Sequence, residues 1–384
     1  MTSLLPKSPP ITAPASDLDI FARLPCTAFV TRLSKIRQRM LQIKVDAAFI
    51  THPPDIRWAC GFTGSNGLLL VLPHCAHFLT DSRYREQARQ EVHDAEVHVP
   101  GYYLDGYVYE KGLLNGLSNV LYQAEVLPAA RLAALQQQGF GCNWIGGPPF
   151  LAPLVASKEE AEIAVIREAQ RLTDHVFDQV LGLLKPGMTE RIVAAEIVYR
   201  LLIGGAEKVS FDPIVASGPN SALPHARPSL RRLQQDEPVL LDFGCVVDGY
   251  ASDMTRTVFL GRPDQAFQEV YHTVLEAQLA ALDYACAGIA SDALDAAART
   301  VISEKGYGDA FTHSLGHGVG LQVHEWPPVS FRSDVRLPAN TVVAIEPGIY
   351  LPGKYGVRIE DLVVLREGTC ENLTASPKQL IRLD

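Results

Sequence analysis

The 384-residue chain lacks the features that mark a secreted or membrane-spanning protein. Its seven cysteines are scattered, odd in number and without a C-x-x-C pair, so we expect no disulfide framework and a reducing compartment. The N-terminal MTSLLPKSPPITAPASDLD has no apolar core long enough for a signal peptide. The strongest apolar stretch, GLLLVLP at 67–73, is too short to cross a bilayer. These absences predict a cytoplasmic protein with no membrane partner.

The chain also lacks an excess of positive charge. Its formal net charge is −9, which argues against a nucleic-acid partner because phosphate binding needs a basic face. The content of 47% hydrophobic and 20% charged residues is ordinary for a soluble globular protein. The length exceeds that of most single hydrophobic cores, so we expect two domains.

Composition and periodicity predict where these domains begin and end. Residues 1–25 are rich in Pro, Ser and Thr and predict a flexible tail. Residues 26–150 alternate between helix-like and strand-like pieces, which predicts a smaller α/β domain. The Gly- and Pro-dense segment 141–153 predicts a linker. In the smaller domain we expect a helix over 31–45 and strands over 47–50, 67–72 and 77–80.

Residues 157–384 predict a second domain that mixes helices and strands. Ser157 and Glu160 have the spacing of a capping box, which predicts a helix that runs to about Leu184. Glycines at 204 and 205 predict the end of another helix. Further helices are expected over 190–203, 264–285 and 291–304, with strand-rich blocks at 209–216, 238–260 and 341–365.

The block PVLLDFGCVVDGYASDMTRTVFL (238–260) predicts a two-stranded hairpin. Asp248-Gly249 is a favoured two-residue turn, since both turn positions need positive φ. With that turn, residues whose numbers sum to 497 stand opposite each other, so Asp253 faces Gly244. Asp242 and Asp253 then become diagonal neighbours on one face and can share metal ions, with room left by Gly244. The alternative is a solvent-facing hairpin with scattered acids.

The block FTHSLGHGVGLQVHEWPP (311–328) places three histidines among glycines. Glycine on both sides of His317 lets backbone and ligand approach closely. A single histidine is more often structural than functional. Three of them within twelve positions favour a polar site that carries chemistry.

The block VVAIEPGIYLPGKYGVRIEDLVVL (342–365) holds two acids in an apolar context. Glu346 ends one expected strand, and Glu360 is expected inside the next, near Arg358. A buried carboxylate needs a partner, either a metal ion or a cation such as Arg358 in a buried ion pair. The combined set of four carboxylates and one imidazole is rich in oxygen and favours harder divalent ions such as Mn²⁺. Shared carboxylates are the usual way to hold two ions about 3.5–4 Å apart in hydrolases.

Taken together, these motifs resemble the Xaa-Pro peptidase branch of the pita-bread metallopeptidases, which contains aminopeptidase P and prolidase. The likeness rests on PNSALPHARP, LDFGCVVDGYASDMTRTVFLG, HSLGHGVGLQVHEWP, IEPGIY and GVRIED, in the family's order over 157–384. The N-terminal part resembles the creatinase-type domain of the same proteins. The resemblance implies an α+β protein in which a smaller α/β domain precedes a catalytic pita-bread domain.

The resemblance also implies roles for individual residues. The five metal-ligand positions fall on Asp242, Asp253, His317, Glu346 and Glu360. His225 and His324 fall on the histidines that bind substrate and stabilise the tetrahedral intermediate. Glu346 would also act as general base towards a bridging water, Arg358 would orient the Glu360 region, and His313 would line the substrate pocket. The cofactor would be two divalent ions, Mn²⁺ first, with Co²⁺ and Zn²⁺ as alternatives.

The implied substrates are proline-containing peptides, and relatives are commonly homodimers or homotetramers. FTGSNG (62–67) and TDSRYREQA (80–88) look closer to aminopeptidase P, so we expect an Xaa-Pro aminopeptidase. The alternative is an Xaa-Pro dipeptidase, which needs a cation for the free carboxylate of its substrate; Arg332 or Arg336 would supply it. A non-catalytic scaffold with this fold is disfavoured because all five ligands are present.

Overall fold

The computed structural model describes residues 26–101 and 103–383. The tail expected over residues 1–25 lies outside this range. Among the described residues, no helix combines the length and the apolar character needed to span a membrane. Two domains follow one another along the chain, and each mixes helices with strands, so the expected α+β class is confirmed.

The N-terminal domain is built on a six-stranded sheet with the order β4-β3-β2-β1-β5-β6. Its strands are β1 (Ala47–Ile50), β2 (Leu68–Val71), β3 (Ala76–Leu79), β4 (Glu96–His98), β5 (Asn119–Tyr122) and β6 (Asn143–Gly146). Its helices are α1 (Cys26–Ile43), α2 (Pro53–Cys60), α3 (Arg85–Glu91), α4 (Leu104–Glu110) and α5 (Ala129–Gln137), with the short turn η1 (Ser82–Tyr84). Alternate residues of β1 enter hydrophobic clusters on opposite faces of the sheet, which explains its uniform apolarity.

The prediction of a linker over 141–153 is wrong. This segment contains β6, the edge strand of the sheet, and the beginning of helix α6 (Ala152–Ala156). Trp144 packs edge-on against Phe49 with ring centroids 5.2 Å apart, which holds the segment against the sheet. The prolines of the segment fall outside β6: Pro148 and Pro149 follow the strand, and Pro153 lies in the first turn of α6, where proline is tolerated.

Four long helices of the C-terminal domain match the expected ranges closely. They are α7 (Glu160–Leu181), α8 (Glu190–Ile203), α9 (Gln265–Tyr284) and α10 (Ser291–Glu304). The expected capping box is wrong by two residues: Glu159 caps α7, and Glu162 accepts from the Glu159 backbone N–H at 2.9 Å. Ser157 instead donates to the carbonyl of Ala339 at 2.8 Å, which holds it outside the helix.

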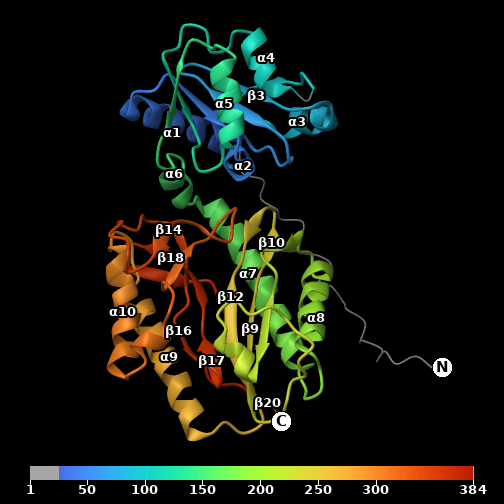
Figure 1. The fold of residues 1–384 in the computed structure, drawn as a ribbon, viewed down its shortest axis with the longest axis vertical. Helices are drawn as coiled ribbons and strands as arrows, with labels where there is room; N and C mark the ends of the chain where they lie inside the picture. Colours follow the sequence, from blue (N-terminus) through green and yellow to red (C-terminus); the bar gives the residue numbers. More distant parts are fainter. Residues whose placement is uncertain (1–25, 102, 384) are drawn as a thin grey trace, which may run out of the picture.

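The strands of this domain form curved sheets between two pairs of helices. In Figure 1, α7 and α8 flank one side, and α9 and α10 flank the other. One sheet has the order β20-β12-β9-β8, and another the order β14-β13-β15-β18-β19. The strands are β7 (Lys208–Val209), β8 (Ile214–Ser217), β9 (Glu237–Phe243), β10 (Cys245–Val247), β11 (Tyr250–Ala251), β12 (Met254–Leu260), β13 (Gly316–Gly318), β14 (Glu325–Val329), β15 (Val342–Ile345), β16 (Gly348–Leu351), β17 (Tyr355–Arg358), β18 (Asp361–Arg366), β19 (Thr369–Asn372) and β20 (Arg382–Leu383). Two short 3-10 turns, η2 (Gly218–Ala222) and η3 (Gly308–Ala310), complete the domain.

The predicted register of the hairpin is confirmed. Val247 pairs with Tyr250, and Asp242 pairs with Thr255, so the paired numbers sum to 497 along its whole length. Asp248 and Gly249 have φ of 42° and 74°, as the predicted turn requires. The chemistry of two turn residues therefore places Asp242 of β9 and Asp253, which directly precedes β12, on one face.

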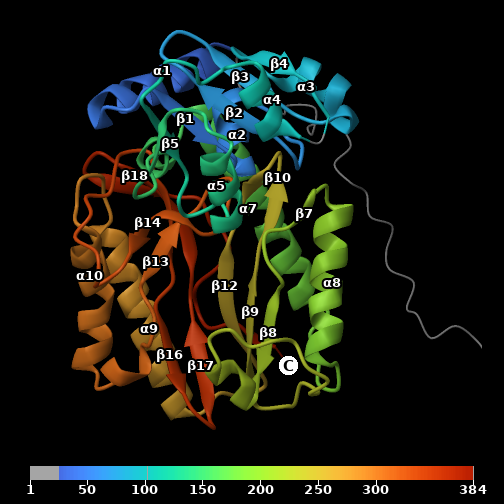
Figure 2. The ribbon, with the colours of Figure 1, turned by 45° about the horizontal axis from the view of Figure 1, so that its top comes forward.

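The two domains meet at this turn and at the start of α7. Arg57 of α2 donates to Asp248 at 2.7 Å. Arg32 of α1 is fully buried and lies 2.9 Å from Glu162. Figures 1 and 2 show the N-terminal domain above the ends of β10 and β14. This contact covers one end of the sheets that carry the acidic residues.

Candidate active site

The five residues expected as metal ligands come together inside the C-terminal domain. Asp242 lies on β9, Asp253 directly precedes β12, His317 lies on β13 and Glu346 directly follows β15. Glu360 was expected inside a strand, and this is wrong: it occupies the break between β17 and β18. Donor atoms of Asp253, His317 and Glu360 all lie within 4.8 Å of one another.

His317 stands between two of the carboxylates. Its Nε2 is 3.7 Å from Oδ2 of Asp253 and 3.6 Å from Oε1 of Glu346. Its Nδ1 lies 3.1 Å from the carbonyl oxygen of Gly318, which accepts the N–H and fixes the tautomer. Burial lowers the pKa of His317 to about 3, so the imidazole is neutral. The lone pair of Nε2 therefore faces the acids.

Glycines allow the strands of the site to approach closely. A Cβ on Gly316 would lie 1.9 Å from the carbonyl oxygen of Ala344, which confirms that backbone crowds His317. A Cβ on Gly244 would lie 1.9 Å from the carbonyl oxygen of Ser252. Gly244 was expected to leave room for metal ions, and this is wrong. The glycine makes room for the backbone of the opposite strand instead.

Burial makes this concentration of negative charge costly. Asp253 is 4% exposed, and its pKa is raised well above the usual value by burial and then by Glu360, Asp242 and Glu346. The pKa of Glu360 is likewise raised, first by burial. Burial raises the pKa of Glu346 to about 8, although the charge of Arg358 opposes this. The protein alone does not stabilise four ionised carboxylates here.

Two unsatisfied oxygen atoms test whether metal ions fit this site. Oδ1 of Asp242 and Oδ1 of Asp253 are buried and have no hydrogen-bond partner. A buried carboxylate oxygen without a partner is costly, and a cation is the missing partner. Carboxylate oxygens and one neutral imidazole are ligands for divalent cations. The donor set and the unsatisfied atoms therefore both fit divalent metal ions.

Arg358 is the one cation that contacts the acids directly among the described residues. It donates to Asp242, and its Nε lies 3.9 Å from Oε2 of Glu346. The alternative of a buried ion pair is thus partly correct, because Arg358 contacts Asp242 and Glu346. A single guanidinium leaves most of the negative charge uncompensated, so the ion pair does not account for the cluster.

Sequence reasoning missed two residues of this network. The Thr255 hydroxyl accepts from Nε of Arg358 at 3.1 Å and donates to Oε2 of Glu360 at 2.7 Å. Arg358 therefore reaches Glu360 through Thr255. The Tyr350 hydroxyl accepts from Arg358 at 2.7 Å and lies 2.9 Å from Nε2 of His313. Thr255 could have been found, because it is two residues from Asp253 and shares its strand face.

The remaining predicted residues lie around this cluster. The His324 ring is 3.9 Å from the His317 ring, and burial lowers the pKa of His324. Burial also lowers the pKa of His313 to about 4. His225 is exposed and follows Pro224, whose carbonyl accepts from Arg358 at 3.2 Å.

A pocket of about 350 Å³ with mostly apolar walls lies next to Arg358 and is not lined by the five expected ligands. Its walls include Pro224 and Tyr350, which both accept hydrogen bonds from Arg358. Arg332 lies on the surface with its guanidinium over the Phe331 ring at 4.9 Å. Its backbone N–H donates to Ser330, whose hydroxyl accepts from Ser314 beside His313. Arg336 donates to the carbonyl of Gly288.

Each of the two domains matches a known protein family. Residues 164–367 match the model of metallopeptidase family M24, and residues 32–154 match the creatinase/prolidase N-terminal domain. The chain is 34% identical to the Xaa-Pro dipeptidase of Pyrococcus horikoshii, over 91% of this chain and 98% of that protein.

Two solved structures are also similar over nearly the whole chain. One is an Xaa-Pro dipeptidase from Bacillus anthracis, with a TM-score of 0.90 and 35% identity over 92% of this chain and 100% of that one. The other is an X-Pro aminopeptidase from Thermotoga maritima, with a TM-score of 0.83 and 38% identity over 90% and 100% of the two chains. The buried acidic cluster, the two domain matches and these relatives lead to one conclusion: the chain belongs to metallopeptidase family M24 and to its Xaa-Pro peptidase branch.

Proposed function

We propose that this enzyme is an Xaa-Pro dipeptidase, which hydrolyses the bond between an N-terminal residue and a C-terminal proline. The proteins from Pyrococcus horikoshii and Bacillus anthracis, which carry this name, support the dipeptidase alternative better than the expected aminopeptidase. The similarity to the Thermotoga maritima aminopeptidase keeps the latter as the second candidate.

The proposed metal site consists of Asp242, Asp253, His317, Glu346 and Glu360. The observation that carries this assignment is the pair of buried carboxylate oxygens without partners, on Asp242 and Asp253. Four carboxylates exceed the need of one ion and suit two. The preponderance of oxygen ligands favours Mn²⁺ among divalent ions. When bound, such ions supply a nucleophile at neutral pH and polarise the scissile carbonyl.

The surrounding residues would prepare the site and assist the reaction. Glu346 accepts a proton from the attacking water as general base. His324 and His225 donate hydrogen bonds to the negative charge that develops on the substrate carbonyl oxygen, where such donors are most effective. Arg358 and Thr255 hold Asp242 and Glu360 in place through the bonds described above.

The pocket and Arg332 would set the substrate class. A largely apolar pocket beside Tyr350 suits the pyrrolidine ring of proline. The free carboxylate of a dipeptide needs a cation, and Arg332 is exposed and tied to the loop of His313 through Ser330 and Ser314. We propose that Arg332 binds this carboxylate.

A hydrolysis panel tests the proposal. Metal-free protein is incubated with Mn²⁺ and with matched Xaa-Pro and Xaa-Ala dipeptides, and the released amino acids are quantified. We expect Mn²⁺-dependent cleavage of the Xaa-Pro dipeptides and much slower cleavage of the Xaa-Ala controls. Equal cleavage of both series, or cleavage without added metal, would contradict the proposal.

A further inference from the structure

A second group of metal-binding side chains lies in the N-terminal domain, on the edge of its sheet. His77 is on β3, and Glu96 and His98 are on β4, the edge strand. The parallel pairing places His77 opposite Glu96 and Leu79 opposite His98, so the three side chains share one face. The pattern is easy to miss in the sequence, because the two strands are separated by η1 and α3.

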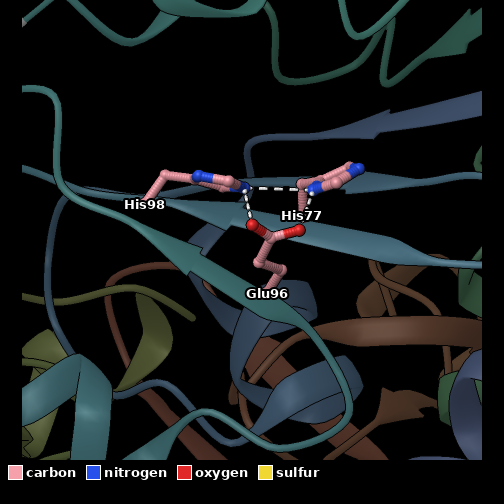
Figure 3. Close-up of side chains that lie close together, drawn as sticks. All are labelled: His77, Glu96 and His98. Atoms are coloured by element: carbon pink, nitrogen blue, oxygen red, sulfur yellow. Dashed lines mark hydrogen bonds and ion pairs between the residues drawn. The ribbon is translucent and has the colours of Figure 1, made fainter.

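The three donor atoms lie at distances that suit a small cation. Nδ1 of His77 is 3.0 Å from Nε2 of His98, and these nitrogens are 3.4 Å and 3.7 Å from the two oxygens of Glu96. Zinc–nitrogen and zinc–oxygen bonds of about 2.0–2.2 Å in a tetrahedron separate neighbouring donors by about 3.3–3.6 Å. The two ring nitrogens would therefore move slightly apart when an ion binds, and the carboxylate would move slightly closer. Figure 3 shows one nitrogen of each ring and the carboxylate directed to a common point.

The other nitrogen of each ring has its own partner. Nδ1 of His98 lies 3.2 Å from the hydroxyl of Tyr107, which can accept its N–H. Nε2 of His77 lies 3.6 Å from Sγ of Cys75. In the metal-free protein His98 Nε2 and His77 Nδ1 hydrogen-bond to each other at 3.0 Å, so an incoming cation would replace that bond, and the outer partners would then accept the ring N–H groups.

Access to the group differs among its members. The side chains of His77 and His98 are 12% and 13% exposed, whereas that of Glu96 is 66% exposed. The two mostly buried imidazoles would therefore form the base of the site, and the exposed carboxylate would complete it from the solvent side. Three protein ligands leave a fourth position open to solvent.

We propose that His77, Glu96 and His98 bind one divalent transition-metal ion, separate from the acidic cluster of the C-terminal domain. Two imidazoles and one carboxylate suit Zn²⁺ and similar borderline ions better than Mn²⁺ or Mg²⁺. The ion would join β4 to β3 and so strengthen the edge of the sheet. An ion that binds only the folded protein raises its melting temperature.

Metal counting on the full chain tests this site. Chelator-treated protein is dialysed against Zn²⁺, and bound zinc per chain is measured for wild type, His77→Ala, Glu96→Ala and His74→Ala. His74 is exposed in the same turn before β3 and serves as the matched control. We expect the first two variants to lose one zinc per chain, with affinity at that site lowered at least about 100-fold, and His74→Ala to match wild type.

A variant of the other site separates the two. Asp253→Asn should lose metal from the C-terminal cluster and keep the zinc that depends on His77. The Zn²⁺-induced rise in melting temperature should persist in Asp253→Asn and disappear when His77→Ala is added. Unchanged zinc content in both His77→Ala and Glu96→Ala would overturn the proposal.

Discussion

Nε2 of His317 lies 3.6 Å from Oε1 of Glu346, and the backbone fixes this relationship. The N–H of Glu346 donates to the carbonyl of Leu315 at 2.8 Å, which ties the end of β15 to the approach to β13. Gly316 permits the contact of these two segments. Strand pairing therefore positions the proposed metal ligands, so we expect that one of them can be changed without loss of the fold.

The first prediction concerns Asp253→Asn. The amide keeps the size of the side chain but removes one charge from the cluster, so bound metal should fall and Xaa-Pro hydrolysis should collapse. The far-ultraviolet circular dichroism should stay unchanged. Metal analysis and kcat are compared with those of Asp248→Asn, a control on the same hairpin that lies in the turn and contacts Arg57. Near-normal turnover of Asp253→Asn would refute its assignment as a ligand.

The second prediction separates metal ligands from residues that act on the substrate. His324→Ala should retain normal metal content and lose roughly 10²- to 10³-fold in kcat, the usual cost of one lost donor to an oxyanion. His317→Ala, which alters the adjacent ring 3.9 Å away, should lose metal instead. If His324→Ala also loses metal, His324 is a ligand and the proposed division of roles is wrong.

The third prediction concerns Thr255, which positions Glu360. Thr255→Val keeps the shape but removes the hydroxyl that bridges Glu360 and Arg358. Metal affinity should weaken by about 10- to 100-fold, and activity should recover at high metal concentration. Thr257→Val is the matched control, because that hydroxyl bonds only the backbone of Arg358 among the contacts found. Equal metal affinities in the two variants would contradict the role of Thr255.

The fourth prediction is the pH dependence of stabilisation by metal. In the metal-free protein the pKa of Glu346 is raised from 4.5 to about 8. Between these pH values the folded protein binds a proton that the unfolded chain does not, so the free energy of unfolding falls as pH rises. Metal binding needs the ionised carboxylate, so it strengthens over the same range. The rise in melting temperature on adding metal should therefore become larger between about pH 5 and about pH 8. If that rise stayed constant or became smaller with pH, metal binding would not be coupled to ionisation of Glu346.

Local rules predicted those parts of the site that depend on local geometry. The turn at Asp248-Gly249 gave the register of β9 and β12 and thereby the proximity of Asp242 and Asp253. Helix boundaries marked by glycine, as at the end of α8, were also correct. These features depend on residues close in sequence, where steric preferences decide the outcome.

Features set by contacts between distant residues were not predictable in the same way. The capping box shifted by two residues because Ser157 is bound by Ala339, far along the chain. Part of the expected linker forms the edge strand β6, where Trp144 packs on Phe49 of β1. The link from Arg358 to Glu360 through Thr255 needs β12 to meet β17 and the break that follows it, which no single segment reveals.

The fifth prediction concerns Arg332. Arg332→Ala should raise KM for an Xaa-Pro dipeptide by roughly 10- to 100-fold, the cost of losing a hydrogen bond to a charged group, with little change for longer peptides. Arg336→Ala, in the same loop and bonded to Gly288, should behave like wild type. Equal effects of the two substitutions on KM would show that Arg332 does not bind the substrate carboxylate.

The proposed dipeptidase activity requires that the enzyme prefer a dipeptide to a longer peptide. The decisive measurement is kcat/KM of the metal-loaded enzyme for one Xaa-Pro dipeptide and for the same sequence extended by two residues. We expect a clearly higher kcat/KM for the dipeptide. A higher kcat/KM for the extended peptide would mean that the enzyme is an Xaa-Pro aminopeptidase.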